Sequence, residues 1–244
     1  MTQCWEEVAQ LTGNPQYADL RFNADTNTWE SARAIIGDQR VTLGPQASQQ
    51  WTDAPDHLAF VLSRYRAAAS LIGDAQSVLE MGCGEGIGAR ILAKGRSYKG
   101  VDLDEDAIAV ATNGQVVGGL SFLVGDILKT GFPMRRYGAV VSLDVIEHVP
   151  ADREGDFMAF ATGHLDPHGV CVIGTPNAAF DHLASPQSRA GHCNTYTHER
   201  LYMLMARHFR VVQSFGMQDT SIHLGHPEAR HYMLMAGIGP REEV

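Results

Sequence analysis

The sequence predicts a doubly wound α/β domain on a mostly parallel sheet of seven strands, with an antiparallel closing strand and an N-terminal lid segment. From residue 77 onward, short apolar runs of strand length alternate with segments of helical pattern, as right-handed βαβ units require. A glycine-rich turn at 82–88 follows the first of these runs. With 244 residues, the chain is long enough for one sizeable domain with additions.

The first 55 residues differ in character from the rest of the chain. They are polar and irregular and contain all three tryptophans, which predicts short helices and loops serving as a lid or substrate wall. A helix follows, because Pro55 precedes a run of apolar residues at helical spacing and Gly73 lies just beyond it. We therefore divide the chain into an N-terminal segment, 1–55, and a core domain, 56–244.

The elements of the core domain follow from its alternating patterns. Strands are expected where apolar, often β-branched runs are flanked by Gly or Asp, and helices where the period lengthens between them. The two closing strands can pair as an antiparallel hairpin at one edge of the sheet. Ligands of such sheets bind beyond the carboxyl ends of the strands. The predicted strands are 77–81, 98–102, 120–124, 138–143, 168–177, 209–217 and 228–238, and the helices are 87–94, 105–112, 153–163 and one beginning near Thr197.

Composition excludes several classes of function. Nineteen basic against 28 acidic side chains leave a formal net charge of −9, which predicts no general attraction to nucleic acid. Neither a signal peptide nor an uninterrupted apolar run of about 18 residues is present, so we expect no membrane partner. The four cysteines are widely spaced and form no CxxC pair, which suits a reducing cytosol. We expect a cytoplasmic protein with a small-molecule substrate, and a homodimer remains open.

The glycine-rich turn carries the first functional signal. Glycine leaves backbone N–H groups open to a ligand where a strand turns into a helix, and Gly82 and Gly84 fit that need. With Gly86 the spacing is GxGxG rather than the GxGxxG of dinucleotide sites. Considered alone, these glycines are also compatible with a tight turn that binds nothing.

Two acidic residues at later strand ends strengthen the signal. Asp102 ends the second strand, where a carboxylate can accept hydrogen bonds from ribose hydroxyls. Asp126 follows the third strand and can accept from an exocyclic amine, while Ile127 and Leu103 can sandwich a flat base. Each acid alone could be a solvated cap of its strand. The glycine turn and the two acids, however, follow three strands of one sheet in register, and this combination favours a nucleoside site.

These motifs resemble those of class I S-adenosylmethionine-dependent methyltransferases, in the small-molecule branch that includes the ubiquinone-biosynthesis O-methyltransferases. The resemblance rests on "VLEMGCGEG", "GVDLDEDAI", "VGDI" and "YGAVVSLDVIEHVP", in this order, and covers about residues 57–235. It implies a Rossmann-like fold and S-adenosyl-L-methionine as cofactor.

The resemblance also implies a role for each matching residue. Arg64 would meet the carboxylate of the cofactor, although a solvated helix charge is the alternative. The implied cofactor contacts are Gly82, Gly84 and Gly86 at the methionine part, Glu80 and Leu143 near the aminoacyl end, Asp102 at the ribose, and Asp126 with Ile127 at the adenine.

A polar cluster follows the fourth strand. Asp144, Glu147 and His148 lie within about one turn in "SLDVIEHVP", and His192 follows the fifth strand. His148 can take a proton from an attacking hydroxyl because an imidazole titrates near neutral pH, so we predict His148 and His192 as catalytic residues. Hydrogen bonding of Glu147 and His148 to neighbouring loops is the structural alternative.

The same residues raise the question of a metal. The cluster is similar to the E-x-x-E-H metal site of ubiquinone-biosynthesis O-methyltransferases and of small-RNA 2′-O-methyltransferases, which in the RNA enzymes includes a distant His. Here Asp144 replaces the first Glu, which shortens its reach, and His192 offers the distant imidazole. A divalent cation would bind and acidify a substrate hydroxyl. We favour the interpretation without a metal.

The sequence therefore predicts methyl transfer from S-adenosylmethionine to a small-molecule hydroxyl of a sugar, a secondary metabolite or an aromatic compound. The alternatives are an N-methyltransferase acting on a small amine, a nicotinamide-dependent oxidoreductase and a non-catalytic relative. His223 and His226 lie in a polar segment between the closing strands and are candidate substrate contacts, with loop packing as the alternative.

Overall fold

The computed structural model divides into two units by its contacts, Met1–Thr42 and Leu43–Val244. The predicted lid, 1–55, therefore lies largely outside the described residues, while its last part belongs to the second unit. Among the described residues, no helix is both long and apolar enough to cross a membrane. The structure describes residue 33 and residues 41–114, 119–129, 133, 135–218, 220–224 and 230–241.

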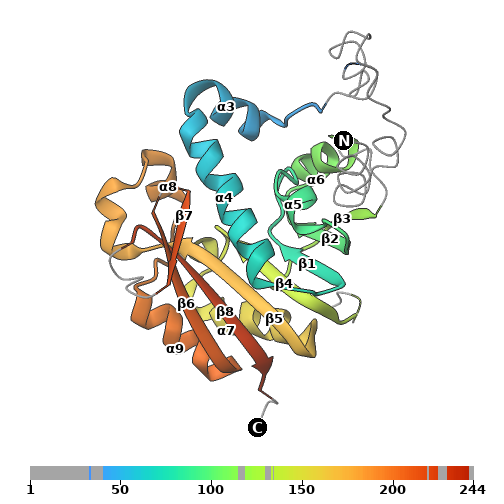
Figure 1. Cartoon of the computed structure of the whole chain (residues 1–244). Helices are drawn as coiled ribbons and strands as arrows, with labels where there is room; N and C mark the ends of the chain where they lie inside the picture. Colours follow the sequence, from blue (N-terminus) through green and yellow to red (C-terminus); the bar gives the residue numbers. More distant parts are fainter. Residues whose placement is uncertain are drawn as a thin grey trace, which may run out of the picture. The chain divides into compact units, whose positions relative to one another are not determined.

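One eight-stranded sheet, in the order β3-β2-β1-β4-β5-β8-β6-β7, forms the centre of the second unit (Figure 1). Strands β3 to β5 in this order pair in parallel, and the pairs β5–β8, β8–β6 and β6–β7 are antiparallel. The predicted mostly parallel sheet with an antiparallel closing strand is confirmed. The strands are β1 Ser77–Met81, β2 Ser97–Asp102, β3 Leu120–Val124, β4 Tyr137–Leu143, β5 Leu165–Pro176, β6 Phe209–Gln218, β7 Ser221–Leu224 and β8 Tyr232–Pro240.

The closing region confirms one prediction and corrects another. The two closing strands, β6 and β8, pair in antiparallel orientation as expected, and β8 has β5 as its other neighbour. The edge is formed by β7, a strand in the segment expected to be a loop. Its alternation of Ser221 and His223 with Ile222 and Leu224 is the period-two pattern of a strand.

Helices cover both faces of the sheet, and the strand residues alternate between two cores. In β4, Val140 packs with helices α7 and α9, whereas Ala139 and Val141 pack on the opposite face with α4 and α5. The described helices are α3 Pro45–Asp53, α4 Pro55–Leu71, α5 Ala89–Leu92, α6 Glu105–Gly114, α7 Glu154–Gly163, α8 Pro186–Gly191 and α9 His198–His208, with 3₁₀ turns η2 Ile146–His148, η3 Ala151–Arg153 and η4 Ala178–Leu183.

Local signals explain where two of these helices begin. Helix α4 starts at Pro55, whose fixed φ suits the first turn and whose missing N–H needs no partner there. Helix α9 begins after Thr197, whose Oγ1 accepts a hydrogen bond from the N–H of Arg200 at 3.3 Å. The predicted helix at 55–72 and the predicted start near Thr197 are both confirmed.

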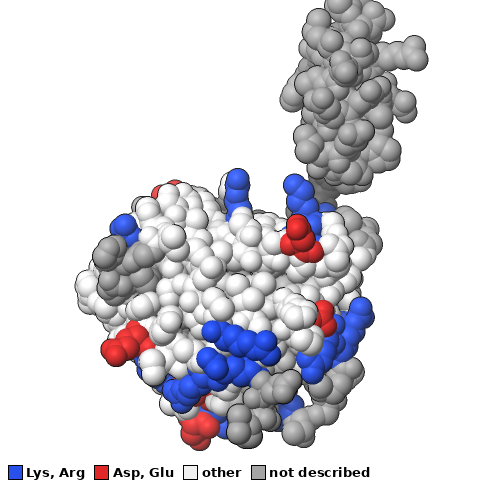
Figure 2. Space-filling model, turned by 60° about the horizontal axis from the view of Figure 1, so that its bottom comes forward, with Lys and Arg blue, Asp and Glu red and all other residues white. Residues whose placement is uncertain are grey.

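Basic side chains gather at the end of the molecule that lies away from the carboxyl ends of the parallel strands. Figure 2 shows Lys and Arg side chains grouped on this face among few Asp and Glu side chains, although the net charge of the chain is −9. The acidic excess is therefore not spread evenly over the surface.

Candidate active site

The turn between β1 and α5 has a backbone that only glycine adopts readily. Gly82 and Gly84 have φ of 76° and 49°, in the left-handed region. A Cβ on Gly82 would lie 2.3 Å from Cγ2 of Val145, whereas a Cβ on Gly84 would meet nothing within 4 Å. Gly82 thus allows close packing against the segment after β4, and Gly84 presents an open backbone.

A cavity of about 600 Å³ lies at the carboxyl ends of β1, β2 and β4, beside this turn. It is the position at which ligands of parallel α/β sheets bind. Three of the predicted site residues, Glu80, Gly86 and Asp126, do not line it. The predicted residues that do line it are Arg64, Gly82, Gly84, Asp102, Leu103, Ile127, Leu143, His148 and His192.

Asp102 joins the glycine turn to the end of β2. Its Oδ2 accepts a hydrogen bond from the N–H of Gly84 at 2.7 Å, and its Oδ1 accepts one from the N–H of Asp104 at 3.0 Å. The carboxylate is thereby fixed in orientation at the cavity wall. Each oxygen keeps a further lone pair, so both can accept hydrogen bonds from a diol.

Asp126 lies just outside the cavity wall. Its Oδ1 accepts a hydrogen bond from the N–H of Leu128 at 2.9 Å, and its Oδ2 pairs with Nζ of Lys129 at 3.2 Å. The backbone hydrogen bond and the lysine lower the pKa of Asp126. The neighbouring Ile127 reaches the cavity instead.

Glu80 is buried beneath the turn rather than at the cavity surface. Its carboxyl group accepts hydrogen bonds from the hydroxyls of Tyr98 and Tyr65. Burial raises the pKa of Glu80 to about 7, against the lowering effect of these hydrogen bonds. Glu80 therefore supports the turn from below.

Arg64 of α4 forms an ion pair across the cavity. Its Nη1 lies 2.7 Å from Oδ1 and 2.6 Å from Oδ2 of Asp144, and its guanidinium packs against the rings of both Phe60 and Tyr232. Only 7% of Arg64 is exposed, so it is not a solvated helix charge. Among the described residues, Asp144 is the one non-glycine with a positive φ, 57°. Such strain is concentrated at functional sites.

The sequence analysis missed Glu85, which holds α3 against the turn. Its two carboxylate oxygens accept hydrogen bonds from the N–H groups of Gln46 and Ala47, at 2.8 and 3.1 Å. The N-cap residue of α3, Gly44, offers no side chain, and a Cβ there would lie 2.4 Å from Glu85. Glu85 thus replaces the missing cap, and α3 forms part of the cavity wall through Gln46, Ala47 and Gln50.

We expect Glu85→Ala to lower the free energy of unfolding by about 1 kcal/mol, because it removes the only side-chain cap that the described residues provide to α3. Urea unfolding followed by circular dichroism measures this change. Gln49→Ala, at an exposed position of the same helix, is the matched control and is expected to leave stability within about 0.5 kcal/mol. Equal stability of the Glu85 variant and the parent would contradict the capping role.

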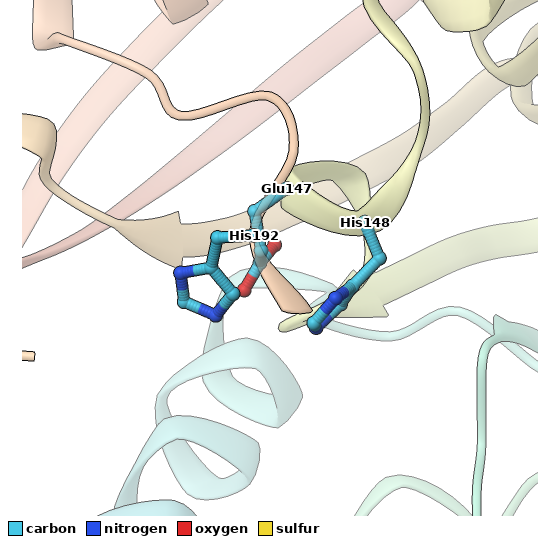
Figure 3. Close-up of side chains that lie close together, drawn as sticks. All are labelled: Glu147, His148 and His192. Atoms are coloured by element: carbon cyan, nitrogen blue, oxygen red, sulfur yellow. The ribbon is translucent and has the colours of Figure 1, made fainter. Parts of the chain in front are cut away.

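Glu147, His148 and His192 meet at the cavity (Figure 3). Glu147 and His148 come from η2, directly after β4, and His192 follows α8. The two imidazole rings are 5.0 Å apart between centroids. The structure thus brings together three residues that the sequence analysis placed in one cluster, whereas Asp144 turns to Arg64.

Burial dominates the electrostatics of this cluster. Removal from water raises the pKa of Glu147 to about 8, and the nearby charge of Asp144 adds to the rise. Burial also lowers the pKa of His192, with a further lowering from His148. Of the two remaining histidines expected near the site, His223 lies on β7 away from the cavity lining, and His226 lies outside the described residues.

Solved structures of methyltransferases share this fold. The methyltransferase domain of bacterial CtHen1 matches with a TM-score of 0.61 and 16% identity, over 74% of this chain and 99% of that one. The N-methyltransferase NodS of Bradyrhizobium japonicum, solved with S-adenosyl-L-homocysteine, matches with a TM-score of 0.58 and 18% identity, over 88% of this chain and 100% of that one. At these identities the likeness establishes the fold.

Sequence comparisons identify the family. The fatty-acid O-methyltransferase of Mycolicibacterium smegmatis is 34% identical over 83 residues, which are 33% of this chain and 30% of that protein. The match thus spans less than a third of that relative's length. Residues 45–214, more than half of the chain, match the family described as "Methyltransferase domain". The chain therefore belongs to this family of methyltransferase domains.

Proposed function

We propose that this chain transfers a methyl group from S-adenosylmethionine to a hydroxyl oxygen of a small molecule: a sugar, a secondary metabolite or an aromatic compound. The observation that supports this proposal is the position of His148 and His192 on the same cavity as Gly84 and Asp102. Asp102 is assigned to the ribose of the cofactor. The two imidazoles are assigned to the acceptor.

The chemistry of the reaction explains why imidazoles are suited to this position. The acceptor oxygen forms its bond to the methyl carbon as the bond from that carbon to sulfur breaks. The electron pair of the broken bond stays on sulfur, which changes from a sulfonium to a neutral thioether. The hydroxyl proton must leave, because an oxygen that kept it would carry a positive charge. His148 and His192 promote its loss.

The protein's other task is alignment. Oxygen, methyl carbon and sulfur must lie in line, and water must be kept from the reacting groups. In the cavity wall, Leu103, Ile127 and Leu143 supply apolar surface for this purpose. The relative from M. smegmatis is by its name an O-methyltransferase. The family match offers no support for the nicotinamide-dependent alternative.

We expect His148→Ala and His192→Ala each to lower kcat about 100-fold or more while changing the Kd for S-adenosylmethionine less than about threefold, because an acid–base contribution acts on the chemical step. S-adenosylhomocysteine release in a panel of catechols, sugars and primary amines measures the rate. His168→Ala, at an exposed position away from the cavity, is the control. Turnover of amines alone would contradict O-methylation and indicate N-methylation instead. Full activity of both variants would contradict the assigned role.

A further inference from the structure

We propose that the acceptor is an uncharged, polyhydroxylated molecule such as a sugar, bound by Gln46 and Gln50 of α3, His57 of α4 and Ser188 of α8. All four residues line the cavity. They come from three helices, whereas the groups assigned to the methyl donor follow β1 and β2. This assignment rests on the proposed function and narrows its acceptor to one chemical class.

The four side chains keep hydrogen-bonding capacity for a ligand. Gln46 and Gln50 are four residues apart, so they lie on the same face of α3. In the part of the chain that the structure describes, the side chains of Gln46, Gln50 and His57 have no hydrogen-bond partner. Oγ of Ser188 contacts Oγ of Ser185 at 3.0 Å and has a further lone pair. Amides and hydroxyls both donate and accept hydrogen bonds, so this set matches a ring with several hydroxyl groups.

An anionic acceptor would find no unpaired arginine or lysine among the described lining residues. Arg64 is the one such residue there, and its Nη1 lies 2.6 Å from Oδ2 of Asp144. Burial lowers the pKa of His57, and the positive charge of Arg64 lowers it further, so this imidazole is uncharged at neutral pH. A carboxylate, such as the head of a fatty acid, would therefore lose its hydration without gaining a partner.

An amine acceptor is disfavoured because the carboxylates of the cavity are already engaged. The oxygens of Glu85 accept hydrogen bonds from α3, and those of Asp144 contact Arg64. Only 1% of Glu147 is exposed, and Asp102 is assigned to the ribose of the cofactor. Within the described lining, no carboxylate is left to pair with an ammonium group.

The same three helices supply little surface for a flat ring or an acyl chain. The apolar residues that they add to the described lining are Ala47 and Val61, and Tyr65 is only 6% exposed. A catechol or an acyl chain placed here would leave the two amides without partners, which is unfavourable. A neutral molecule with several hydroxyl groups is the class that satisfies them.

Calorimetry of the full chain saturated with S-adenosylhomocysteine tests the acceptor class. The neutral probes are the methyl glycosides of glucose, galactose, mannose and rhamnose, and the comparison probes are catechol, octanoate and hexylamine. We expect at least one glycoside to bind at least about tenfold more tightly than each comparison probe, because a site built for hydroxyl groups rejects ligands that lack them.

Two variants test the assigned residues. Gln50→Leu retains helix propensity and approximate size but removes the amide, so we expect it to weaken glycoside binding about tenfold. Ser188→Ala is expected to weaken the same binding about threefold or more. Gln49→Leu, at an exposed position of α3 that does not line the cavity, is the matched control and should bind as the parent does. Thermal unfolding shows that each variant is folded.

Tighter binding of any comparison probe than of every glycoside, or no glycoside binding, would overturn the acceptor class. Equal glycoside binding by Gln50→Leu, Ser188→Ala and the parent would overturn the assigned residues. The same probes are also incubated with S-adenosylmethionine, and their methylation is measured by mass spectrometry. Glycoside binding without methylation of any probe would refute the proposed function alone, and methylation of catechol without glycoside binding would refute the polyhydroxylated acceptor alone.

Discussion

Replacing Asp102 with alanine is expected to weaken binding of S-adenosylmethionine about 100-fold or more. The carboxylate lies at the cavity and is held by the N–H groups of Gly84 and Asp104. Hydrogen bonds from two ribose hydroxyls to a charged acceptor contribute about 1.5–3 kcal/mol each, and loss of both accounts for the change. The mutation also releases the N–H of Gly84, so the glycine turn loses its fixed position. Isothermal titration calorimetry measures the affinity.

The neighbouring acid gives a matched control. Asp104 does not line the cavity, and its Oδ1 accepts hydrogen bonds from the N–H groups of Asp106 and Ala107 at the start of α6. Asp104→Ala should therefore lower stability by about 1 kcal/mol and leave cofactor affinity within about threefold. Unchanged binding by Asp102→Ala would remove Asp102 from the cofactor site.

The free energy of unfolding is expected to fall as the pH rises from 5 to 8, and Glu80→Gln is expected to remove about 2–3 kcal/mol of that fall. In the folded chain Glu80 has a pKa of about 7, against 4.5 for a glutamate side chain in water. Below the pKa that Glu80 has in the unfolded chain, its carboxyl group is protonated in both states, and its contribution to stability is fully present. Between the pKa of the unfolded chain and that of the folded chain, Glu80 is ionised in the unfolded chain but still protonated in the folded one, so stability declines as the pH rises. The loss is complete above the pKa of the folded chain.

The surroundings of Glu80 make glutamine the suitable replacement. Its neighbours are Tyr65 of α4, Tyr98 of β2, Asp102 at the end of β2, and Cys83. The oxygen of a neutral amide can still accept from the hydroxyl of Tyr98, so packing is retained. Denaturant unfolding at a series of pH values provides the measurement, and Glu105→Gln, at an exposed position, should retain the slope of the parent. Parallel curves for parent and Glu80→Gln would contradict the assignment.

Local patterns were sufficient to predict most of the sheet. The apolar run at 77–81 is β1, and the run at 138–143 is β4 apart from one residue. These strands are buried on both faces, so burial requires apolar residues at nearly every position, and the pattern is unmistakable. Strand β7 was missed because one side of an edge strand is exposed and its flanking residues are polar.

Pairs distant in sequence could not be predicted from local patterns. Arg64 and Asp144 are 80 residues apart, and Glu85 is 39 residues from Gln46. Spacing and helical period carry no information about contacts at such separations. By contrast, Glu147 and His148 are adjacent in sequence, and His192 follows the neighbouring strand, so the topology of a parallel sheet was enough to place them together.

The hydrogen bonds from α3 to Glu85 couple two sides of one cavity, so that ligand binding on one side affects the free energy of the other. One side is the glycine turn, assigned to the methyl donor, and the other is a helix that lines the remaining space. Linkage is reciprocal. If ordering of helix α3 raises the affinity of the turn for a ligand by some factor, binding of that ligand raises the equilibrium constant for ordering of α3 by the same factor. Donor and acceptor affinities measured separately would therefore not multiply to the affinity of the ternary complex.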